Sequence, residues 1–552
     1  MSKSLKNISV VATVTVLSRV LGLVRESCIA AVFGLQGGLG SAYVTAFTLP
    51  NLFRRLLGEG ALTAAFVPTL THELEARNRA STFALISKVA SWLALVTVVL
   101  VALSMIIFSQ AAYWVGLAKH WGMESATADR FELAAQLAVI LFPYMVFVCL
   151  AAAFSAACQV LGRFTEPALS PVWLNLASIG ALALGSWWAW DAPNRMNLLC
   201  VGVLVGGFLQ MTVPGVVLWR EGWRPILDLR LDARVREIAR LMAPTLIGSA
   251  IYLVNISMSR FIGLSLNDSA AQALNLATRV MELPIGVFTA AIATVVFPLI
   301  ARHAARSEWG MLGKDYHKGL RLVLVLNVPA AVGLALLSEP IVRLLFQRGA
   351  FHASDTTMMT PILAVYALGL PFLSYTSVAL RGFYALKDTA TPVRAAAVSF
   401  VVNIVLSVVL MHWFSTVGLA LASNLAVLAQ AWFLQTRLSR KLDGLGFAPL
   451  LPSLGKIIMA SILMGLVVWG GEHVVAQMPL VSWLKNLMSM LDLPFPWEED
   501  SPLLASRLRD LTVVLGLIPV AAGCYAALLW LMRIEGRDDL EPIIAKLRGR
   551  KA

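Results

Sequence analysis

The sequence predicts an all-α integral membrane protein with fourteen transmembrane helices: two six-helix lobes related by a parallel repeat, plus two C-terminal helices. Composition is the first reason, because 59% of the 552 residues are hydrophobic and only 14% are charged, whereas a soluble domain has about 25% charged residues. Apolar stretches of about 20 residues, the length that crosses a bilayer, recur along the whole chain. Basic residues gather in alternate connections between those stretches.

The predicted spans follow one another with mostly short connections. The first span carries Arg19 and Arg25 and runs too long for the hydrophobic part of a cleavable signal, so we expect it to be retained. The longest central connection, 220–240, is basic, and the longest outer one, 476–509, contains the acidic segment WEEDSP. The spans are 8–33, 41–68, 85–116, 132–160, 166–190, 197–219, 235–265, 270–301, 319–346, 357–385, 391–412, 416–436, 454–475 and 510–533.

Charge in the connections predicts the orientation. One set is rich in lysine and arginine, as before the first span and in the tail 533–552. The set that alternates with it is poor in basic residues, as at 34–40 and 265–270. Because basic connections remain in the cytoplasm, we expect both termini to be cytoplasmic. An even number of spans agrees with termini on the same side.

The two halves of the chain look like repeats. Phe383 and Ala385 follow Phe154 and Ala156 by 229 residues, and similar matches recur at this offset. Six spans fit in one period, and an even number keeps the orientation, so the repeat is parallel. Chance similarity between apolar stretches is the alternative. The predicted domains are an N-lobe at 1–219, a basic cytoplasmic linker at 220–234, a C-lobe at 235–436, and a part with spans 13 and 14 and a basic tail at 437–552.

Four arginines lie deep inside the apolar spans: Arg19, Arg25, Arg54 and Arg279. With a rise of 1.5 Å per residue, Arg19 lies ~16 Å, Arg54 ~20 Å and Arg279 ~14 Å from the start of its span. A charged side chain at the bilayer centre costs ~2.5–3.5 kcal/mol or more. Several such arginines therefore predict a cationic cavity for an anionic ligand, and the planar guanidinium suits phosphate.

Two of these arginines have close neighbours that leave alternatives open. Glu282 follows Arg279 by three residues, so both lie on one helix face, and a structural ion pair is the alternative to ligand binding. Arg55 lies about 100° around the helix from Arg54, so only one of them can point to the centre of a cleft. Pro284 in the same span as Arg279 would let that helix bend or unwind around a site.

The sequence indicates no metal, no cofactor and no enzyme activity. The five cysteines show no metal or redox spacing, and the seven histidines fall in loops or at span ends. Nucleophile elbows and phosphate-binding loops are absent from the sequence. The net charge of +13 is scattered among short loops, which favours contact with anionic membrane lipids over binding of nucleic acid.

Four segments resemble the MurJ/MviN family, in order and at the proper spacing: SRVLGLVRE (18–26), LPNLFRRLLGEGALTAAFVP (49–68), ATRVMELPIGV (277–287) and RGFYALKDTATPV (381–393). That family comprises lipid II flippases of the multidrug/oligosaccharidyl-lipid/polysaccharide exporter superfamily. The resemblance covers spans 1 to 12, and the fourteen-span count fits a family that adds two spans to a twelve-span core.

The resemblance implies a substrate, a place and a mechanism. Lipid II, the undecaprenyl-pyrophosphate-linked disaccharide pentapeptide, would move from the cytoplasmic to the periplasmic leaflet of the bacterial inner membrane by alternating access. Other cell-wall synthesis proteins are implied as further partners. Spans 13 and 14 would form a groove for the undecaprenyl tail, with a merely lipid-facing shell as the alternative. The family's cavity residues fall, by motif, on Arg19, Arg25, Arg54, Arg279 and Glu282.

The chain departs from the family pattern at three positions. Ser41 and Thr278 stand where the family often has acids, and Ala390 stands where it often has a basic residue. Fewer acids weaken any coupling scheme that relies on those carboxylates. The alternative function is a cation-coupled drug exporter or a lipid-linked oligosaccharide exporter of the same superfamily, and a drug exporter should carry acids in its cavity. A lipid-binding scaffold would need no buried charges, and a lipid-phosphate enzyme would need catalytic acids or histidines at the membrane surface.

Overall fold

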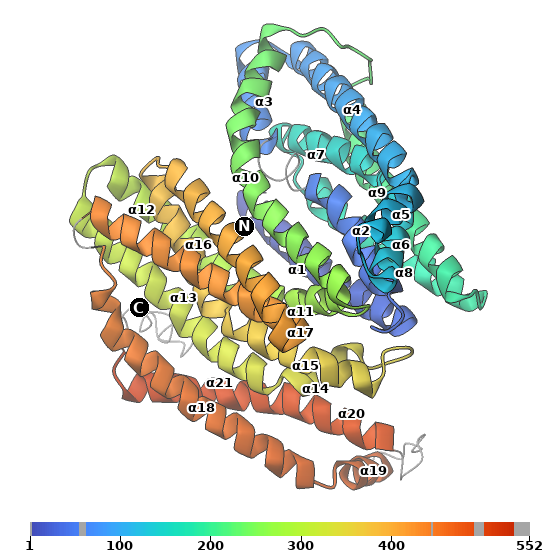
Figure 1. Cartoon of the computed structure of the whole chain (residues 1–552). Helices are drawn as coiled ribbons and strands as arrows, with labels where there is room; N and C mark the ends of the chain where they lie inside the picture. Colours follow the sequence, from blue (N-terminus) through green and yellow to red (C-terminus); the bar gives the residue numbers. More distant parts are fainter. Residues whose placement is uncertain (1–2, 54–61, 443–444, 491–501, 535–552) are drawn as a thin grey trace. The chain divides into compact units, whose positions relative to one another are not determined.

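The computed structural model describes residues 3–53, 62–442, 445–490 and 502–534. All regular elements in these ranges are helices, and they contain no strand (Figure 1). The chain divides into two compact units. Unit 1 comprises Met1–Leu276 together with Arg348–His352, and unit 2 comprises Ala277–Gln347 together with Ala353–Ala552.

Unit 1 is a bundle of long helices. α8 packs along both α9 and α1, α7 packs on α9, and α10 packs on α2 and α3. In Figure 1, α10 runs along α3 and continues towards α2. The helices are α1 (Lys3–Phe33), α2 (Leu39–Phe53), α3 (Leu62–Ala76), α4 (Arg79–Ser109), α5 (Ala111–His120), α6 (Ser125–Leu141), α7 (Tyr144–Val160), α8 (Thr165–Trp187), α9 (Ala192–Arg220), α10 (Ala233–Leu266) and, up to Leu276, α11 (Ala270–Pro284).

Small residues allow α8 and α9 to approach closely. A Cβ added to Gly202 would lie 2.5 Å from the Cβ of Ala181, and one added to Gly206 would lie 2.8 Å from the Cα of Leu174. Both contacts are too short for real atoms, so glycine is required at these positions. Helices in a membrane gain their association from such close packing, because lipid tails are as apolar as the side chains they replace.

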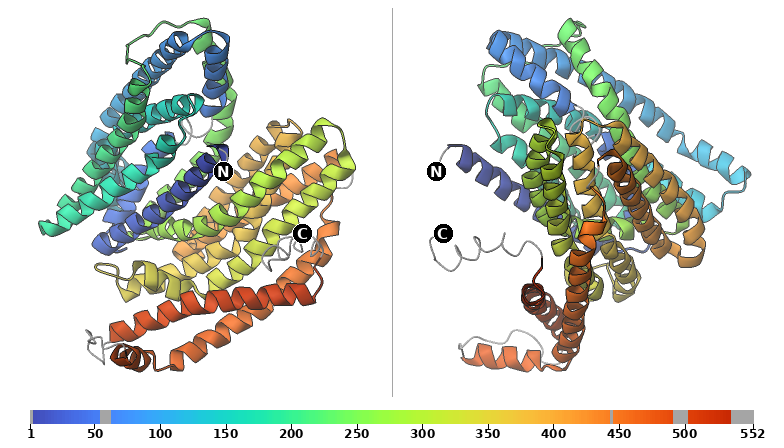
Figure 2. Two further views of the ribbon diagram at one scale, coloured as in Figure 1. Left: turned by 180° about the vertical axis from the view of Figure 1, so that it is seen from behind. Right: turned by 90° about the vertical axis from the view of Figure 1, so that its left-hand side faces the viewer.

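Unit 2 is organised around α13. This helix contacts α12, α15, α16 and α18, and its Tyr316 and Val323 are fully buried in the core. α18 and α21 lie side by side in both Figure 1 and Figure 2. The elements are η2 (Ile285–Thr289), α12 (Ala290–Ala305), α13 (Trp309–Leu336), α14 (Ser338–Phe346), α15 (Ala353–Leu368), α16 (Leu370–Ala385), α17 (Ala390–Lys441), η3 (Ala448–Leu450), α18 (Leu451–Gln477), α19 (Leu480–Met490), α20 (Pro502–Thr512), η4 (Val513–Leu517) and α21 (Ile518–Leu531).

The element α17 is a hairpin of two helical arms. Its 52 residues would extend ~78 Å if straight, far more than the ~30 Å hydrocarbon core of a bilayer. Ser415 has non-helical dihedrals, with φ at 49° and ψ at −132°. A Cβ on Gly418 would lie 2.3 Å from the Leu410 carbonyl oxygen, so the chain folds back tightly here. The two arms correspond to the predicted spans 391–412 and 416–436.

The protein is a multi-pass membrane protein. Eight helices in the described ranges are long and apolar enough to cross a membrane, or nine if the bent pair α6 and α7, which meet at 46°, forms one span. The fourteen predicted spans fall mainly on helical residues where they are described, but spans 85–116, 132–160, 319–346 and 357–385 each cover two helices separated by a turn. Residues 54–61 of the second span lie outside the described ranges. The count of fourteen stays a prediction, as does the arrangement into two lobes.

The compact units divide the chain at a different place from the predicted lobes. The helix α10 is the first of the predicted C-lobe, yet it packs on α2, α3 and α6 of unit 1. The boundary lies between Leu276 and Ala277, within α11, and not at the 220–234 linker. Compactness does not by itself define bodies that move, so the predicted lobes remain a hypothesis about motion.

Candidate functional site

Arg25 and Glu26 form a buried ion pair inside α1. Nη2 of Arg25 donates to Oε1 of Glu26 at 2.6 Å, and the two residues are only 6% and 4% exposed. Nδ2 of Asn275, which also belongs to unit 1, donates to Oε2 of Glu26 at 3.1 Å. Both carboxylate oxygens are therefore occupied. Removing one partner of such a pair would leave an uncompensated buried charge.

The guanidinium of Arg25 keeps unused donor capacity. Its Nε is buried and has no hydrogen-bond partner among the described residues, and the same is true of Oη of Tyr43 on α2. Electrostatic coupling joins Arg25 to Tyr43 and also to Tyr144. Buried donors without acceptors are costly, and they mark a place that an additional acceptor would satisfy. Tyr43 and Asn275 were not among the site residues predicted from the sequence.

Arg19 lies on a different face of α1. It is exposed, while the neighbouring Ser18 and Gly22 face α8, where Nδ2 of Asn175 donates to the Ser18 carbonyl oxygen at 3.2 Å. Six residues separate Arg19 from Arg25, which places the two side chains about 120° apart around a regular helix. The structure therefore does not direct both arginines to one point from α1, although both can border a wide cavity.

Arg279 and Glu282 form an ion pair in unit 2. Nη1 of Arg279 lies 2.9 Å from Oε2 of Glu282, as their three-residue spacing predicts, and the side chains are 28% and 44% exposed. This pair is more accessible than Arg25–Glu26 and could exchange partners at lower cost. Arg54 and Arg55 lie outside the described residues. The convergence of the five predicted site residues in one cavity stays a prediction.

The helix changes its form directly after this pair. Pro284 is followed by the π-helix η2, at Ile285–Thr289. Thr289 ends this turn in a buried polar group: its Oγ1 lies 2.8 Å from Oγ of Ser374 and accepts a hydrogen bond of 3.2 Å from Nδ2 of Asn327. Single π turns within helices are frequent at functional sites. The sequence predicted a break near Pro284, but it did not indicate the polar group beside it.

One further buried arginine was not among the site residues predicted from the sequence. Arg260 on α10 is 7% exposed and lies within the predicted span 235–265. An ionisable residue inside a span is a candidate for function, and its position in an apolar stretch was the available signal.

The 220–234 linker is fastened to unit 1 by ion pairs. Glu221 accepts hydrogen bonds from Arg163 at 2.8 Å and from Arg79 at 3.0 Å, and Nζ of Lys88 lies 2.5 Å from Asp232. Hydrogen bonding to Arg163, reinforced by Arg79, holds the pKa of Glu221 below its usual range. These ion pairs therefore hold the linker against the ends of α4, α7 and α9.

The segment that resembles the fourth family motif closes the α17 hairpin. Asp388 accepts hydrogen bonds from the backbone N and Oγ1 of Thr391, at 3.0 and 2.6 Å, and pairs with Lys441 at the end of the second arm. Burial alone would raise the pKa of Asp388, but these hydrogen bonds outweigh it and lower the pKa to about 2. Asp388 therefore ties together the start and the end of α17.

The described residues contain no group of three or more histidines, cysteines, aspartates or glutamates arranged to hold a metal ion. The cysteines are all free.

Comparison with known families gives this arrangement a context. A family profile described as "Lipid II flippase MurJ" matches residues 29–489. The chain belongs to the MurJ family. MurJ proteins are transporters, so the chain belongs to a transporter family and not to an enzyme family. Arg54, Arg279 and Glu282 lie in the matched range, whereas Arg19 and Arg25 precede it and rest on their motif and geometry.

Curated MurJ relatives match most of the chain. A probable lipid II flippase MurJ of Rhizobium tropici is 34% identical over 76% of this chain and 78% of its own length. One from Rhizobium meliloti strain 1021 is 32% identical over 95% of this chain and 92% of its own length. The lipid II flippase MurJ of Burkholderia cenocepacia is 32% identical over 74% of this chain and 78% of its own length.

Solved structures share the fold. A lipid II flippase MurJ in an inward closed conformation matches with a TM-score of 0.68 at 24% identity, over 92% of this chain and 98% of that one. An inward-facing multidrug resistance transporter of the MATE family matches with a TM-score of 0.62 at 13% identity, over 78% and 98%. These likenesses show the fold alone.

Proposed function

We propose that this protein is a lipid II flippase that moves the lipid-linked peptidoglycan precursor from the cytoplasmic to the periplasmic leaflet of the bacterial inner membrane. The observation that carries the proposal is the family match over residues 29–489. The named relatives in Rhizobium and Burkholderia supply the substrate. The proposal includes fourteen spans and two cytoplasmic termini, in keeping with the alternation of basic connections.

The pyrophosphate of the substrate is the proposed ligand of the cavity arginines. A pyrophosphate offers several oxygens to bidentate guanidinium groups. Arg25 supports this role, because its buried Nε has no acceptor among the described residues. Glu26 accepts from Nη2 of this group and is itself held by a hydrogen bond from Asn275. Arg279 is proposed to exchange Glu282 for a phosphate oxygen, because both side chains are partly exposed.

Alternating access is the proposed mechanism, with Arg19, Arg25, Arg54, Arg279 and Glu282 lining the cavity. The π-helix at Ile285–Thr289 provides an irregular turn where the helix of Arg279 can change its bend. A membrane potential that is negative inside would draw unoccupied cationic elements inward, at ~2.3 kcal/mol per charge per 100 mV. This would return the empty carrier to the state that faces the cytoplasm.

The competing function is a cation-coupled drug exporter or a lipid-linked oligosaccharide exporter of the same superfamily. An exporter of organic cations needs acids in its cavity that are free to bind them. In this chain Glu26 is already engaged by Arg25 and Asn275, and Glu282 by Arg279. The surplus of arginine favours an anionic substrate.

The decisive experiment measures the leaflet in which lipid II lies. Cells depleted of their own flippase and supplied with this chain should present lipid II to a periplasmic enzyme that cleaves it, and cells supplied with Arg279→Ala should not. Lys119→Gln is the matched control, because it removes a charge from an exposed pair with Asp129. If the intact chain is produced at normal levels and lipid II stays inaccessible, the proposed function is wrong.

A further inference from the structure

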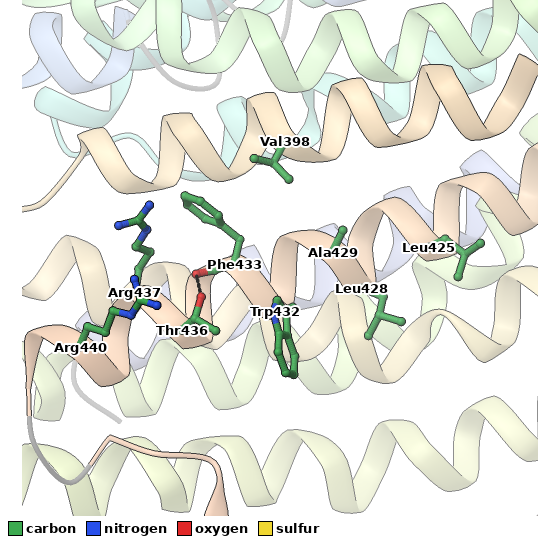
Figure 3. Close-up of a pocket in the computed structure, with 9 residues that line it drawn as sticks. All are labelled: Val398, Leu425, Leu428, Ala429, Trp432, Phe433, Thr436, Arg437 and Arg440. Atoms are coloured by element: carbon green, nitrogen blue, oxygen red, sulfur yellow. Dashed lines mark hydrogen bonds between the residues drawn. The ribbon is translucent and has the colours of Figure 1, made fainter.

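The second arm of α17, together with Val398 of the first arm, lines an open groove of about 750 Å³ in unit 2 (Figure 3). Val398 of the first arm forms one wall, and Leu425, Leu428 and Trp432 of the second arm line its length. Arg437 and Arg440 lie together at one end, as Figure 3 shows. The groove is thus apolar along most of its length and cationic at one end.

The amino-acid spacing builds this polarity into the second arm. Leu428, Trp432 and Arg440 lie on one row of residues four apart, and Leu425 and Arg437 lie on the adjacent row. The first row also contains Thr436, the second contains Ala429 and Phe433, and both rows end in arginine. The twelve residues from Leu425 to Arg437 rise ~18 Å, close to the ~15 Å depth of one leaflet of a ~30 Å hydrocarbon core.

The two arginines have no acidic partner within the described chain. Lys441, the next basic residue, pairs with Asp388, whereas no ion pair is formed by Arg437 or Arg440. The guanidinium of Arg437 lies over the ring of Phe433, 5.2 Å from its centroid. Both arginines are exposed, and Arg394, also exposed, lies one helical turn before Val398.

We propose that this groove binds one acidic glycerophospholipid of the cytoplasmic leaflet, with its phosphate on Arg437 and Arg440 and an acyl chain along Leu428 and Trp432. The charge of the groove favours an acidic lipid, because a lipid without net charge would leave the two guanidinium groups without a counterion. The length of the groove also fits a lipid chain, because its apolar part is about as long as one leaflet is deep. Trp432, which is 73% exposed, lies ~7.5 Å along the helix from Arg437 and ~12 Å from Arg440, and tryptophan is enriched at membrane interfaces.

The proposal rests on the orientation given under the proposed function, because the arginine end must face the cytoplasm. It does not rest on lipid II as the transported substrate. A lipid in this groove contacts both arms of the hairpin that Asp388 and Lys441 close. Bound lipid would therefore stabilise the packing of the two arms.

Native mass spectrometry of the purified full-length protein tests the proposal, with phosphatidylglycerol and phosphatidylcholine as probes. The protein should retain one phosphatidylglycerol in preference to phosphatidylcholine. Arg437→Gln combined with Arg440→Gln should weaken phosphatidylglycerol retention roughly tenfold and leave phosphatidylcholine unchanged. Ala429→Phe, which fills the groove without changing its charge, should weaken it as well. Lysine at both arginine positions should restore part of the affinity and excludes misfolding as the cause.

Arg220→Gln combined with Arg224→Gln is the matched control. Arg224 also lies over an aromatic ring, that of Trp219 at 5.3 Å, but outside the groove. If this control loses as much phosphatidylglycerol as the groove variant, the effect comes from general surface charge, and the proposal is overturned. One other result would also overturn it: displacement of the phosphatidylglycerol by millimolar inorganic phosphate, which would mean an anion site without a lipid chain.

Discussion

The buried pair Arg25–Glu26 allows stability and transport to be separated. Glu26→Gln leaves the Arg25 guanidinium, which is 6% exposed, without its counterion, and it weakens the hydrogen bond from Asn275. Breaking one partner of a buried pair costs about 3–5 kcal/mol, and the weakened hydrogen bond adds less than about 1 kcal/mol. We therefore expect Glu26→Gln to lower the thermal unfolding temperature of the purified protein clearly.

The double variant Arg25→Gln with Glu26→Gln carries the decisive comparison. Two neutral amides can hydrogen-bond to each other, so most of the lost stability should return. Transport should not return, because the cation proposed to bind pyrophosphate is absent. The assays are a thermal melt and complementation of a flippase-depleted cell. If the double variant complements fully, the pair is structural and the proposed role of Arg25 is refuted.

An exposed pair provides the reference for the size of the effect. Lys119 and Asp129 lie 2.8 Å apart, with side chains that are 37% and 67% exposed. Surface pairs of this kind contribute about 0–1 kcal/mol. Lys119→Gln should therefore leave the melting temperature and complementation nearly unchanged. If Lys119→Gln lost as much stability as Glu26→Gln, burial would not explain the large contribution of the Arg25–Glu26 pair to stability.

Three further predictions concern orientation, substrate contact and motion. A single cysteine at Asn267 should react with an impermeant reagent from the periplasm and one at Arg230 should not, and the reverse pattern would invert the direction of transport. Arg279→Ala should abolish complementation at normal protein levels while Arg279→Lys retains part of it, because lysine keeps the charge but lacks the fork; full activity of the alanine variant would favour a structural pair. Cysteines at Ser41 and Ala271 should crosslink readily, because the backbone N of Gln272, which follows Ala271, donates to Oγ of Ser41 at 3.2 Å. Transport by the crosslinked protein would contradict a mechanism that separates these helices.

The α-helical membrane class and the approximate positions of the helices followed from the sequence, whereas the turns that divide predicted spans such as 85–116 and 132–160 into two helices did not. Hydropathy acts locally, since each span must satisfy its own backbone and present apolar side chains wherever it lies in the bilayer. The pairing of Arg279 with Glu282 was also predictable, because three residues on a helix bring two side chains to one face whatever surrounds them. The break at Pro284 and the turn between the arms of α17 have equally local causes in proline, serine and glycine.

Contacts between distant segments required the tertiary structure. Asn275 reaches Glu26 across 249 residues, and α10 joins α2 and α3 although the repeat assigns it to the other half. The groove between the arms of α17 depends on how two apolar helices face each other, and their composition does not specify this. The sequence by itself determined which segments are helical and where charge is costly. Only the packing decided which of those charges find a partner, because an arginine in an apolar span has the same sequence signature whether its neighbour is a carboxylate, a ligand or water.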